Sequence, residues 1–278
     1  IVKTEQPTTV MCSYNRLNGK YLSDHKRFLT DVLRDEWGFK GIVVSDWGAV
    51  NDRGEGIKAG LDLEMPGSKG LNDKSIYKAL ENGTITEEDL DRVVLRLIKF
   101  AYENTVREVK GVTYDIEEHN AIARRAAEGG AVLLKNDGAL PLDKQQSIAV
   151  IGKLAKKLRY QGGGSSHILP HKVTTFLDAL DNAGQKYEYA DGYTLKGEGY
   201  KKSLINKAVK TAKDKDAVVL FIGLTDAFES EGYDRSHIKM PSSHVTLVKE
   251  LLKVNKNIIV VLSCGSPVEI GDWDKDVK

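Results

Sequence analysis

The sequence is poor in the residues that mark disulfide-rich and irregular proteins. Of its 278 residues, only 2 are cysteine and only 6 are proline. Cys12 and Cys264 are far apart, and each lies in an apolar, strand-like context. These contexts favour two buried free thiols over a disulfide, which slightly favours a reducing compartment such as the cytoplasm. The composition, 41% hydrophobic and 29% charged, is that of a globular protein.

An excess of charge of one sign is also absent, because 41 basic residues are balanced by 40 acidic ones. This balance, without a visible basic patch, gives no indication of a nucleic-acid partner. No run approaches the roughly 18 apolar residues that a membrane-spanning helix needs, so no membrane partner is predicted.

Motifs for metal, nucleotide and serine-nucleophile chemistry are missing as well. The histidines are scattered, and the close pair His167 and His171 is interrupted by Pro170, so we predict no metal site. The segment QGGGSSH (161–167) lacks both the Gly-Lys-Ser/Thr ending of a P-loop and the spacing Gly-x-Gly-x-x-Gly. It is better interpreted as a flexible loop whose backbone approaches a ligand. No Gly-x-Ser-x-Gly supports a catalytic triad, and no cofactor is predicted.

Strand and helix patterns alternate through residues 1–105. Apolar runs at 8–14 and 41–46 predict buried strands, and LDLEMPG (61–67) predicts the end of a third. The amphipathic segment 84–104 opens with a Thr86–Asp89 capping-box pattern. About three β/α units are visible, which is too few for an eight-stranded barrel, so a barrel would need strands from upstream. Because the chain starts at Ile1, we expect it to be a piece of a longer polypeptide.

Periodicity fades at 106–115, which predicts a linker, and the alternation resumes over 116–278. Helices are expected at 116–130, 174–184, 203–216 and 242–256, and strands at 131–136, 147–152, 186–190, 217–223 and 257–265. This order predicts an open, mostly parallel sheet with helices on both faces. The predicted fold class is therefore α/β, with the C-terminal portion of a barrel followed by an α/β sandwich domain.

Polar and aromatic side chains follow the strands of the first part, where parallel α/β folds place their sites. The strand ends carry Met11, Tyr14 and Asn15, then Asp46 and Trp47, and then Asp62 and Glu64. An Asp at a strand end either caps the next helix or does chemistry. The adjacent Trp47 favours chemistry, because an indole ring stacks on the apolar face of a sugar while a carboxylate binds its polar edges.

A loop dense in carboxylates follows the predicted strand 217–223. It contains Asp226, Glu229, Glu231 and Asp234. A solvated acidic loop is one interpretation, but Gly232 and Tyr233 interrupt the charges and the loop again follows a strand. Paired carboxylates can cleave a glycosidic bond, one as nucleophile and one as proton donor, when about 5–5.5 Å apart. The sequence does not give that distance.

The longest motifs resemble one family. The segment VMCSYNRLNG…FLTDVLRDEWGFKGIVVSDWGAV resembles the nucleophile region of family 3 glycoside hydrolases, which include β-glucosidases. LKNDGALPL, GGGSSHILP, ESEGYDR and VVLSCGSPVEI resemble, in order, the second domain of that family. The resemblance spans nearly the whole chain and implies a (β/α)8-type barrel followed by an α/β sandwich.

The resemblance also implies roles for single residues. Asp46 matches the family nucleophile and Trp47 the adjacent sugar-contacting tryptophan, while Met11 and Tyr14 match positions that line the sugar pocket. Ser165 or Ser166 would lie near the same pocket. Glu231, directly before Gly-Tyr-Asp-Arg, matches the acid/base, with Glu229 as the reserve. Arg235 and Asp234 are expected to hold the loop in shape.

The implied function is a retaining exo-β-glucosidase that acts through a covalent glycosyl–enzyme. The alternatives are a β-xylosidase or a β-N-acetylglucosaminidase on the same frame, although ESEGYDR counts against the latter. A catalytically incomplete fragment or a non-catalytic carbohydrate-binding partner is a further alternative. The family also binds sugar through Asp, Arg and a Lys-His pair upstream of VMCSYN, which this chain does not contain. The expected partners are therefore the substrate and the missing barrel segment, which a separate chain could supply.

Overall fold

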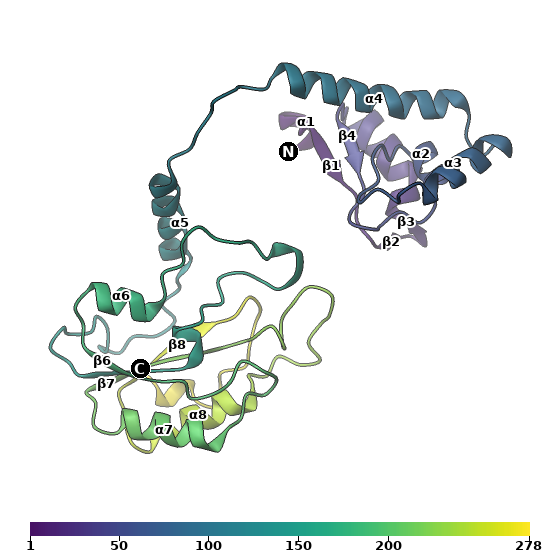
Figure 1. Cartoon of the computed structure of the whole chain (residues 1–278). Coiled ribbons are helices and arrows are strands. Elements are labelled where there is room, and N and C mark those ends of the chain that lie inside the picture. The colour runs from purple at the N-terminus through teal and green to yellow at the C-terminus, as the bar shows by residue number, and fades with distance from the viewer. The chain divides into compact units, whose positions relative to one another are not determined.

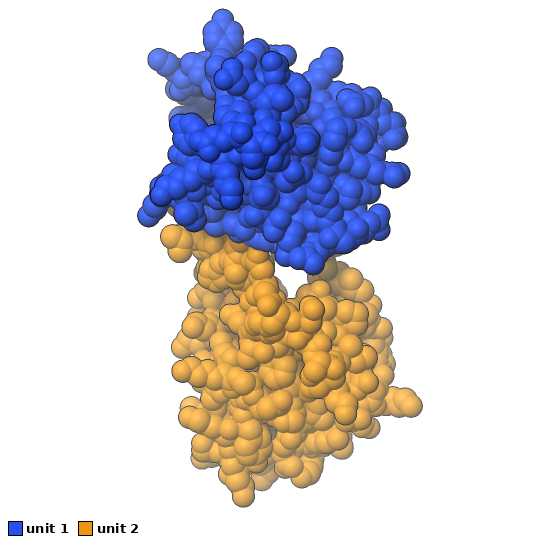
Figure 2. Space-filling model, turned by 90° about the vertical axis from the view of Figure 1, so that its right-hand side faces the viewer, with its two compact units in different colours: residues 1–113 blue, residues 114–278 orange.

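The computed structural model describes residues 1–278, which form two compact units, residues 1–113 and 114–278 (Figure 2). The division falls within the stretch 106–115, where the sequence predicts a linker. No helix in the structure combines the length and the apolar character that crossing a membrane requires.

The first unit alternates short strands with helices. Its strands are β1 (Thr9–Met11), β2 (Arg16–Leu17), β3 (Lys20–Tyr21) and β4 (Ile42–Val44). Its helices are α1 (Val2–Glu5), α2 (Arg53–Ala59), α3 (Leu71–Glu81) and α4 (Glu87–Val106). It also contains a 3-10 turn, η1 (Leu22–Asp24), and a π-helix, η2 (Arg27–Glu36). The predicted capping box is present, because Thr86 and Asp89 each accept from the other's backbone N–H at the start of α4.

Three parallel strand positions lie side by side in this unit. β1 pairs with β4 in register Met11 to Val44, and Leu63 forms a parallel bridge to Val44 on the other side. The buried side chains of Val43, Leu61 and Leu33 form a small core between these strands and η2. Because the strands are parallel, their carboxyl ends, and the polar residues that follow them, meet at one edge.

The second unit contains one parallel sheet. Its strands are β5 (Ile148–Ile151), β6 (Tyr187–Ala190), β7 (Ala217–Gly223) and β8 (Ile258–Ser263), in the order β6-β5-β7-β8. Its helices are α5 (Ile116–Gly130), α6 (Phe176–Asn182), α7 (Lys202–Ala212) and α8 (Ser242–Leu252), with the short turns η3 (Lys153–Ala155), η4 (Gly164–Ser166) and η5 (Asp274–Asp276). Figure 1 shows α7 and α8 on one face of the sheet and α6 on the other, as predicted.

The order of the strands creates a switch point between β5 and β7. The chain passes from β5 to β6 on one side, and then crosses back to place β7 on the other side of β5. The loops that leave β5 and β7 therefore diverge and open a crevice at the carboxyl edge of the sheet, where α/β sheets bind ligands.

One predicted strand is wrong. Residues 131–136 are not part of any sheet, and Val132, Leu133 and Leu134 are exposed. A strand is defined by the hydrogen bonds of a ladder, and the parallel sheet ends at β6 and β8 without pairing to this segment. The apolar run indicated a strand, but a run of apolar residues does not specify a pairing partner.

The two units differ in how fully they bury apolar residues. The second unit has one continuous core around β5 and β7, whose residues are all buried. The first unit has two small cores. Helix α4 packs Val93 against one of them but exposes an apolar stripe, which consists of Leu95, Ile98, Tyr102 and Val106.

Candidate active site

Asp46 lies just beyond the end of β4, with its carboxylate turned back on its own backbone. Its Oδ1 accepts a hydrogen bond from the Trp47 N–H at 2.6 Å. The preceding strand residues Ile42 and Val43 are fully buried, whereas Asp46 is half-buried. The strand is thus fixed by the core while the carboxylate remains accessible at its end.

The turn that carries Asp46 is fastened to Met65 on the neighbouring strand end. The hydroxyl of Ser45 accepts from the Met65 N–H at 2.7 Å and donates to the Met65 carbonyl at 3.1 Å. The Gly48 N–H donates to the same carbonyl at 2.9 Å. Asp46 and Trp47 therefore lie between two attachments to one residue. Ser45 is buried, so its hydroxyl has its full hydrogen-bonding requirement met within the protein.

Three predicted sugar-contacting residues lie at this same edge. The Tyr14 hydroxyl donates to the Trp47 carbonyl at 2.9 Å, which joins the end of β1 to the turn after β4. Met11 is paired in register with Val44, two positions before Asp46. The side chains of Trp47 and Met11 are 63% and 61% exposed. Large apolar side chains so exposed beside a carboxylate are suited to stacking on a ligand.

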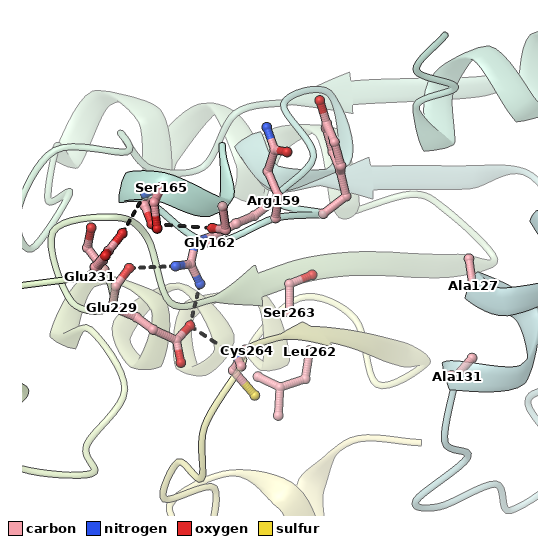
Figure 3. A pocket seen from close by; sticks show the side chains of 17 residues that line it. Ala127, Ala131, Arg159, Gly162, Ser165, Glu229, Glu231, Leu262, Ser263 and Cys264 are labelled. Carbon is pink, nitrogen blue, oxygen red and sulfur yellow. Dashed lines mark hydrogen bonds and ion pairs between the residues drawn. The ribbon is translucent and has the colours of Figure 1, made fainter. Parts of the chain in front are cut away.

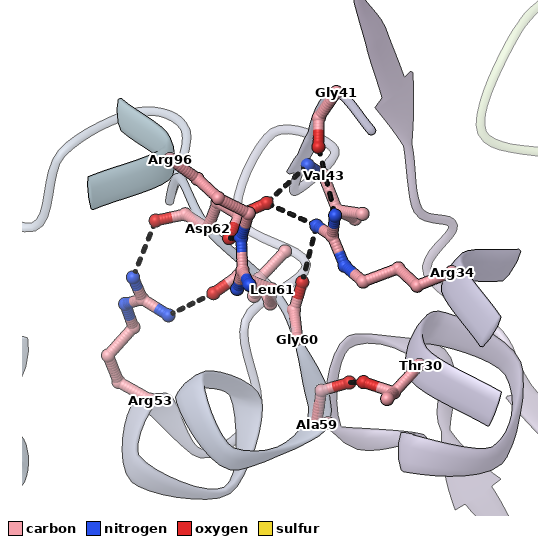
Figure 4. A network of polar contacts seen from close by, with 10 residues as sticks. All are labelled: Thr30, Arg34, Gly41, Val43, Arg53, Ala59, Gly60, Leu61, Asp62 and Arg96. Carbon is pink, nitrogen blue, oxygen red and sulfur yellow. Dashed lines mark hydrogen bonds and ion pairs between the residues drawn. The ribbon is translucent and has the colours of Figure 1, made fainter. Parts of the chain in front are cut away.

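Below this edge, a buried carboxylate ties together the elements around β4. Asp62, which is fully buried, accepts from the Val43 N–H at 2.7 Å and from Arg34 and Arg96 at 2.5 and 2.6 Å (Figure 4). Arg34 also donates to the Gly41 carbonyl, which precedes β4. The sequence pointed to Asp62 as a strand-end group that could meet a ligand. Its buried position and two arginine partners instead give it a structural role.

In the second unit, a cleft of about 1040 Å³ opens at the switch point between β5 and β7 (Figure 3). The glycine-rich loop after β5, the acidic loop after β7 and the end of β8 line it.

Helix α8 is attached to the end of β7, because the Gly223 N–H donates to Nδ1 of the buried His244 at 3.3 Å. Burial lowers the pKa of His244 to about 4, against the raising effect of the Glu198 charge.

Glu229 is held by several bonds within this cleft. Its carboxylate accepts from the Ser266 hydroxyl at 2.5 Å and the Gly265 N–H at 3.0 Å, and it pairs with the Arg159 guanidinium. Burial alone would raise the pKa of Glu229, but the bonds from Ser266, Arg159 and Gly265 outweigh it and hold the pKa below its usual value. Glu229 is thus kept ionised by its surroundings, which suits a structural ion pair better than a proton donor.

Glu231 lies against the glycine-rich loop. Its Oε2 accepts from the Ser165 N–H at 2.5 Å (Figure 3). Both Ser165 and Ser166 line the cleft with Glu231. Gly164, with φ of +78°, lies directly behind the carboxylate. The structure therefore brings the predicted acid/base and both predicted serines together in one cleft.

Arg159 is a contributor to this cleft that sequence reasoning missed. It pairs with Glu229 and Asp226 and also donates to the Glu229 carbonyl at 2.5 Å. Its position just before the glycine-rich loop was the available signal, but its partner Glu229 is 70 positions away in the sequence. Arg235 binds Ser266 and Pro267, and so holds the acidic loop to the loop after β8.

The cysteine prediction is half right. Cys12 is buried, but Cys264 is exposed in the cleft wall, because it lies just beyond β8 rather than within it. Neither is in a disulfide.

The structure contains two groups of predicted site residues. Met11, Tyr14, Asp46 and Trp47 gather in the first unit, and Ser165, Ser166 and Glu231 gather in the second.

Comparisons with known proteins identify the family of both parts of the chain. Residues 2–100 match the N-terminal domain of glycosyl hydrolase family 3, and residues 131–278 match the C-terminal domain of that family. The chain is 46% identical over its whole length to the exo-α-(1→6)-L-arabinopyranosidase of Bifidobacterium breve and to the thermostable β-glucosidase B of Acetivibrio thermocellus.

It covers 38% and 37% of these two relatives, respectively. Among solved structures, it matches a Bifidobacterium adolescentis family 3 β-glucosidase with 45% identity and a TM-score of 0.90, over 100% of this chain and 41% of that one. The fold is therefore the predicted one, the C-terminal portion of a (β/α)8-type barrel followed by an α/β sandwich. Both halves of the chain match the corresponding domain models, so it belongs to glycosyl hydrolase family 3.

Proposed function

We propose that this chain carries both catalytic carboxylates of a retaining exo-β-glucosidase, with Asp46 as nucleophile and Glu231 as acid/base. The observation that carries the proposal is the pairing of an accessible strand-end carboxylate with an exposed indole at Asp46 and Trp47. Family membership and the β-glucosidases among the relatives support the reaction class.

The proposed reaction has two steps. Asp46, ionised, attacks the anomeric carbon while Glu231 gives its proton to the leaving oxygen, and a covalent glycosyl–enzyme forms. Glu231 then acts as base and removes a proton from the attacking water, so the anomeric configuration is retained. Trp47 and Met11 would contact the apolar face of the sugar, and Tyr14 would fix the Trp47 backbone that presents the ring.

The contacts of Glu229 favour Glu231 as the acid/base. Glu229 is bonded to Ser266, Gly265 and Arg159, and its pKa is held below the usual value. A general acid has to carry a proton at the working pH. Removing Glu229 would instead detach the acidic loop from Arg159 and from the loop after β8.

We further propose that a second polypeptide segment completes the barrel and covers the apolar stripe of α4. Three parallel strand positions cannot close an eight-stranded barrel. The stripe of Leu95, Ile98, Tyr102 and Val106 is exposed at helical spacing, as expected of a helix that packs on two sides. That segment would also supply the sugar-binding residues that the family carries upstream.

A second candidate substrate is an α-L-arabinopyranoside, because one relative at 46% identity is named for that activity. This sugar has the ring of a β-galactoside without the hydroxymethyl group. It therefore differs from a β-glucoside in the orientation of the C4 hydroxyl and in lacking C6. Trp47 and Met11 would contact the apolar face of the ring in both cases and would not distinguish the two sugars at C4 or C6. The glycone is therefore tested with a panel of substrates.

The first experiment measures hydrolysis of p-nitrophenyl β-D-glucoside, β-D-xyloside, α-L-arabinopyranoside and β-N-acetylglucosaminide. It uses this chain alone and the reconstituted enzyme, meaning this chain co-expressed with the remaining barrel residues of A. thermocellus β-glucosidase B. We expect turnover of the glucoside by the reconstituted enzyme. Faster turnover of the arabinopyranoside would replace the proposed substrate, and no turnover of any glycoside by either preparation would overturn the proposed enzyme function.

A second experiment separates the two glutamates in the reconstituted enzyme. Glu231→Ala should still form the glycosyl–enzyme from an activated aryl glucoside, and azide should restore turnover by replacing the base-assisted attack of water. Glu229→Ala should lose activity without rescue, because it disturbs loop structure. Azide rescue of Glu229→Ala in place of Glu231→Ala would reverse the assignment.

A further inference from the structure

The glycine-rich loop fits around Glu231 more closely than a flexible ligand-binding loop requires. A methyl group at position 164 would lie 2.6 Å from the Cβ of Glu231, 3.0 Å from its Cδ, and closer still to Oε2. Because Cβ itself is in the way, a change of side-chain rotamer could not relieve the clash. The φ of +78° at Gly164 also disfavours any residue with a side chain.

The next residue adds a directed bond. The Ser165 N–H donates to Oε2 of Glu231 at 2.5 Å, across 66 positions of sequence. An amide that binds an ionised carboxylate forms a charge-assisted hydrogen bond, which is stronger than a neutral one. When Glu231 is protonated on Oε1, its Oε2 can still accept this bond, so the contact serves both states of the acid/base. Gly164 thus lets the backbone approach, and Ser165 supplies the donor at the closest point.

We propose that Gly164 and the Ser165 amide are positioning elements for the acid/base, and that position 164 is glycine because Glu231 has to fit against it. This inference rests on the proposed role of Glu231. The loop that follows β5 would fix the carboxylate at the end of the β7 loop, across the switch point of the sheet. The side chains of Ser165 and Ser166 would remain directed to the cleft that they line.

The bond can be measured without turnover, by amide hydrogen exchange at Ser165 in this chain. Glu231→Ala removes the acceptor and should speed exchange about tenfold or more, as expected for loss of a hydrogen bond to a charged group. Gly164→Ala should speed it similarly, because the clash displaces the carboxylate. Unchanged exchange in both variants would overturn the proposal.

The catalytic consequence is measured in the reconstituted enzyme. Misplacing a catalytic group by about 1 Å can cost about 100-fold, so Gly164→Ala should lower kcat/KM, which reports the glycosylation step, by about that factor for a poor leaving group such as methyl glucoside. For 2,4-dinitrophenyl glucoside the loss in kcat/KM should be at most a few-fold, since that leaving group needs no proton. A merely structural defect would lower both rates equally, and that result would overturn the proposal.

The matched control is Gly184→Ala. Gly184 also has a positive φ, of +69°, but a Cβ there would meet nothing within 4 Å. This variant includes the backbone strain without the clash and should leave the rates and their leaving-group dependence unchanged. Equal leaving-group dependence in Gly184→Ala and Gly164→Ala would show that strain alone causes the effect.

A second pair of variants provides a test if Gly164→Ala does not fold. Ser165→Pro removes the amide donor, whereas Ser165→Ala removes only the hydroxyl, so their difference isolates the bond to Glu231. We expect Ser165→Pro alone to gain the leaving-group dependence. If Glu231→Ala shows azide rescue and Ser165→Pro does not differ from Ser165→Ala, this inference fails while the proposed function stands. If Glu231→Ala shows no rescue, the assignment of the acid/base fails first.

Discussion

The two units hold their carboxylates by different kinds of structure. Asp46 follows a buried parallel strand by two residues, and the hydroxyl of Ser45 and the N–H of Gly48 join its turn to the next strand end. Glu231 lies on a long loop, eight residues beyond β7, and accepts a hydrogen bond from the backbone N–H of Ser165 in another loop. The first carboxylate is fixed by the sheet, and the second by contact between loops.

This difference suits the roles that we propose. A nucleophile forms a bond to one carbon atom and benefits from a rigid position. An acid/base gives a proton in one step and takes one in the next, so it has to serve two positions of the reacting oxygen. The following variants test whether the two supports are as different as the contacts indicate.

The largest effect is expected at Asp46. Asp46→Asn keeps the shape of the side chain but removes the nucleophile, so turnover by the reconstituted enzyme should fall on the order of 10⁴-fold or more. Neither azide nor a better leaving group should restore it. The control is Asp52→Asn, since Asp52 caps α2 through the Glu55 N–H and should affect only stability. Strong residual activity in Asp46→Asn would contradict its role.

The buried ion pairs under β4 should dominate the stability of the first unit. Asp62→Ala leaves Arg34 and Arg96 without their carboxylate partner, which should cost about 3–5 kcal/mol in the free energy of unfolding of that unit. Amide hydrogen exchange at Leu63, whose N–H donates to the Val43 carbonyl and does not bind the Asp62 side chain, measures this change. The control Asp31→Ala breaks an exposed pair with Lys26 and should cost below about 1 kcal/mol. Equal losses of unfolding free energy in Asp62→Ala and Asp31→Ala would show that the contacts of Asp62 do not hold β4.

The same contrast explains how much the sequence could predict. Buried runs such as 217–223 specify strands by themselves, and Asp46 was identifiable because it directly follows such a run. The segment 131–136 was predicted wrongly, because its apolar residues do not reveal the absence of a pairing strand. The roles of Arg159 and Gly164 depend on partners 70 and 67 positions away, and local spacing does not reveal those partners, although both residues lie at the glycine-rich loop.

The stability of the second unit should depend on pH through His244, which accepts a hydrogen bond at the end of β7. Because folding lowers the pKa of His244 from 6.5 to about 4, the unfolded chain binds the proton more tightly. Neutral His244 therefore contributes fully to the stability of the fold above pH 6.5. As the pH falls from 6.5 to 4, the free energy of unfolding decreases by about 3 kcal/mol because of this residue. Urea unfolding at pH 7 and pH 4 should show this extra loss in the wild type and not in His244→Gln. The control His119→Gln should keep the wild-type dependence of the unfolding free energy on pH, since His119 is exposed near the start of α5.

The smallest effect is expected at Ser45, where it sharpens the contrast between the two carboxylates. Ser45→Ala removes both hydrogen bonds to Met65 at a cost of about 1–2 kcal/mol. If the loss of these bonds displaces Asp46, kcat/KM should fall about tenfold, because attack on the anomeric carbon is slower. The loss should be similar for good and poor leaving groups, because a displaced nucleophile slows attack on every substrate. Ser23→Ala, which removes another buried hydroxyl that binds Asp24, should leave kcat/KM unchanged. A loss in Ser45→Ala that disappears with 2,4-dinitrophenyl glucoside would instead place its effect on the proton-donating side, and the sheet would not be the support that distinguishes Asp46 from Glu231.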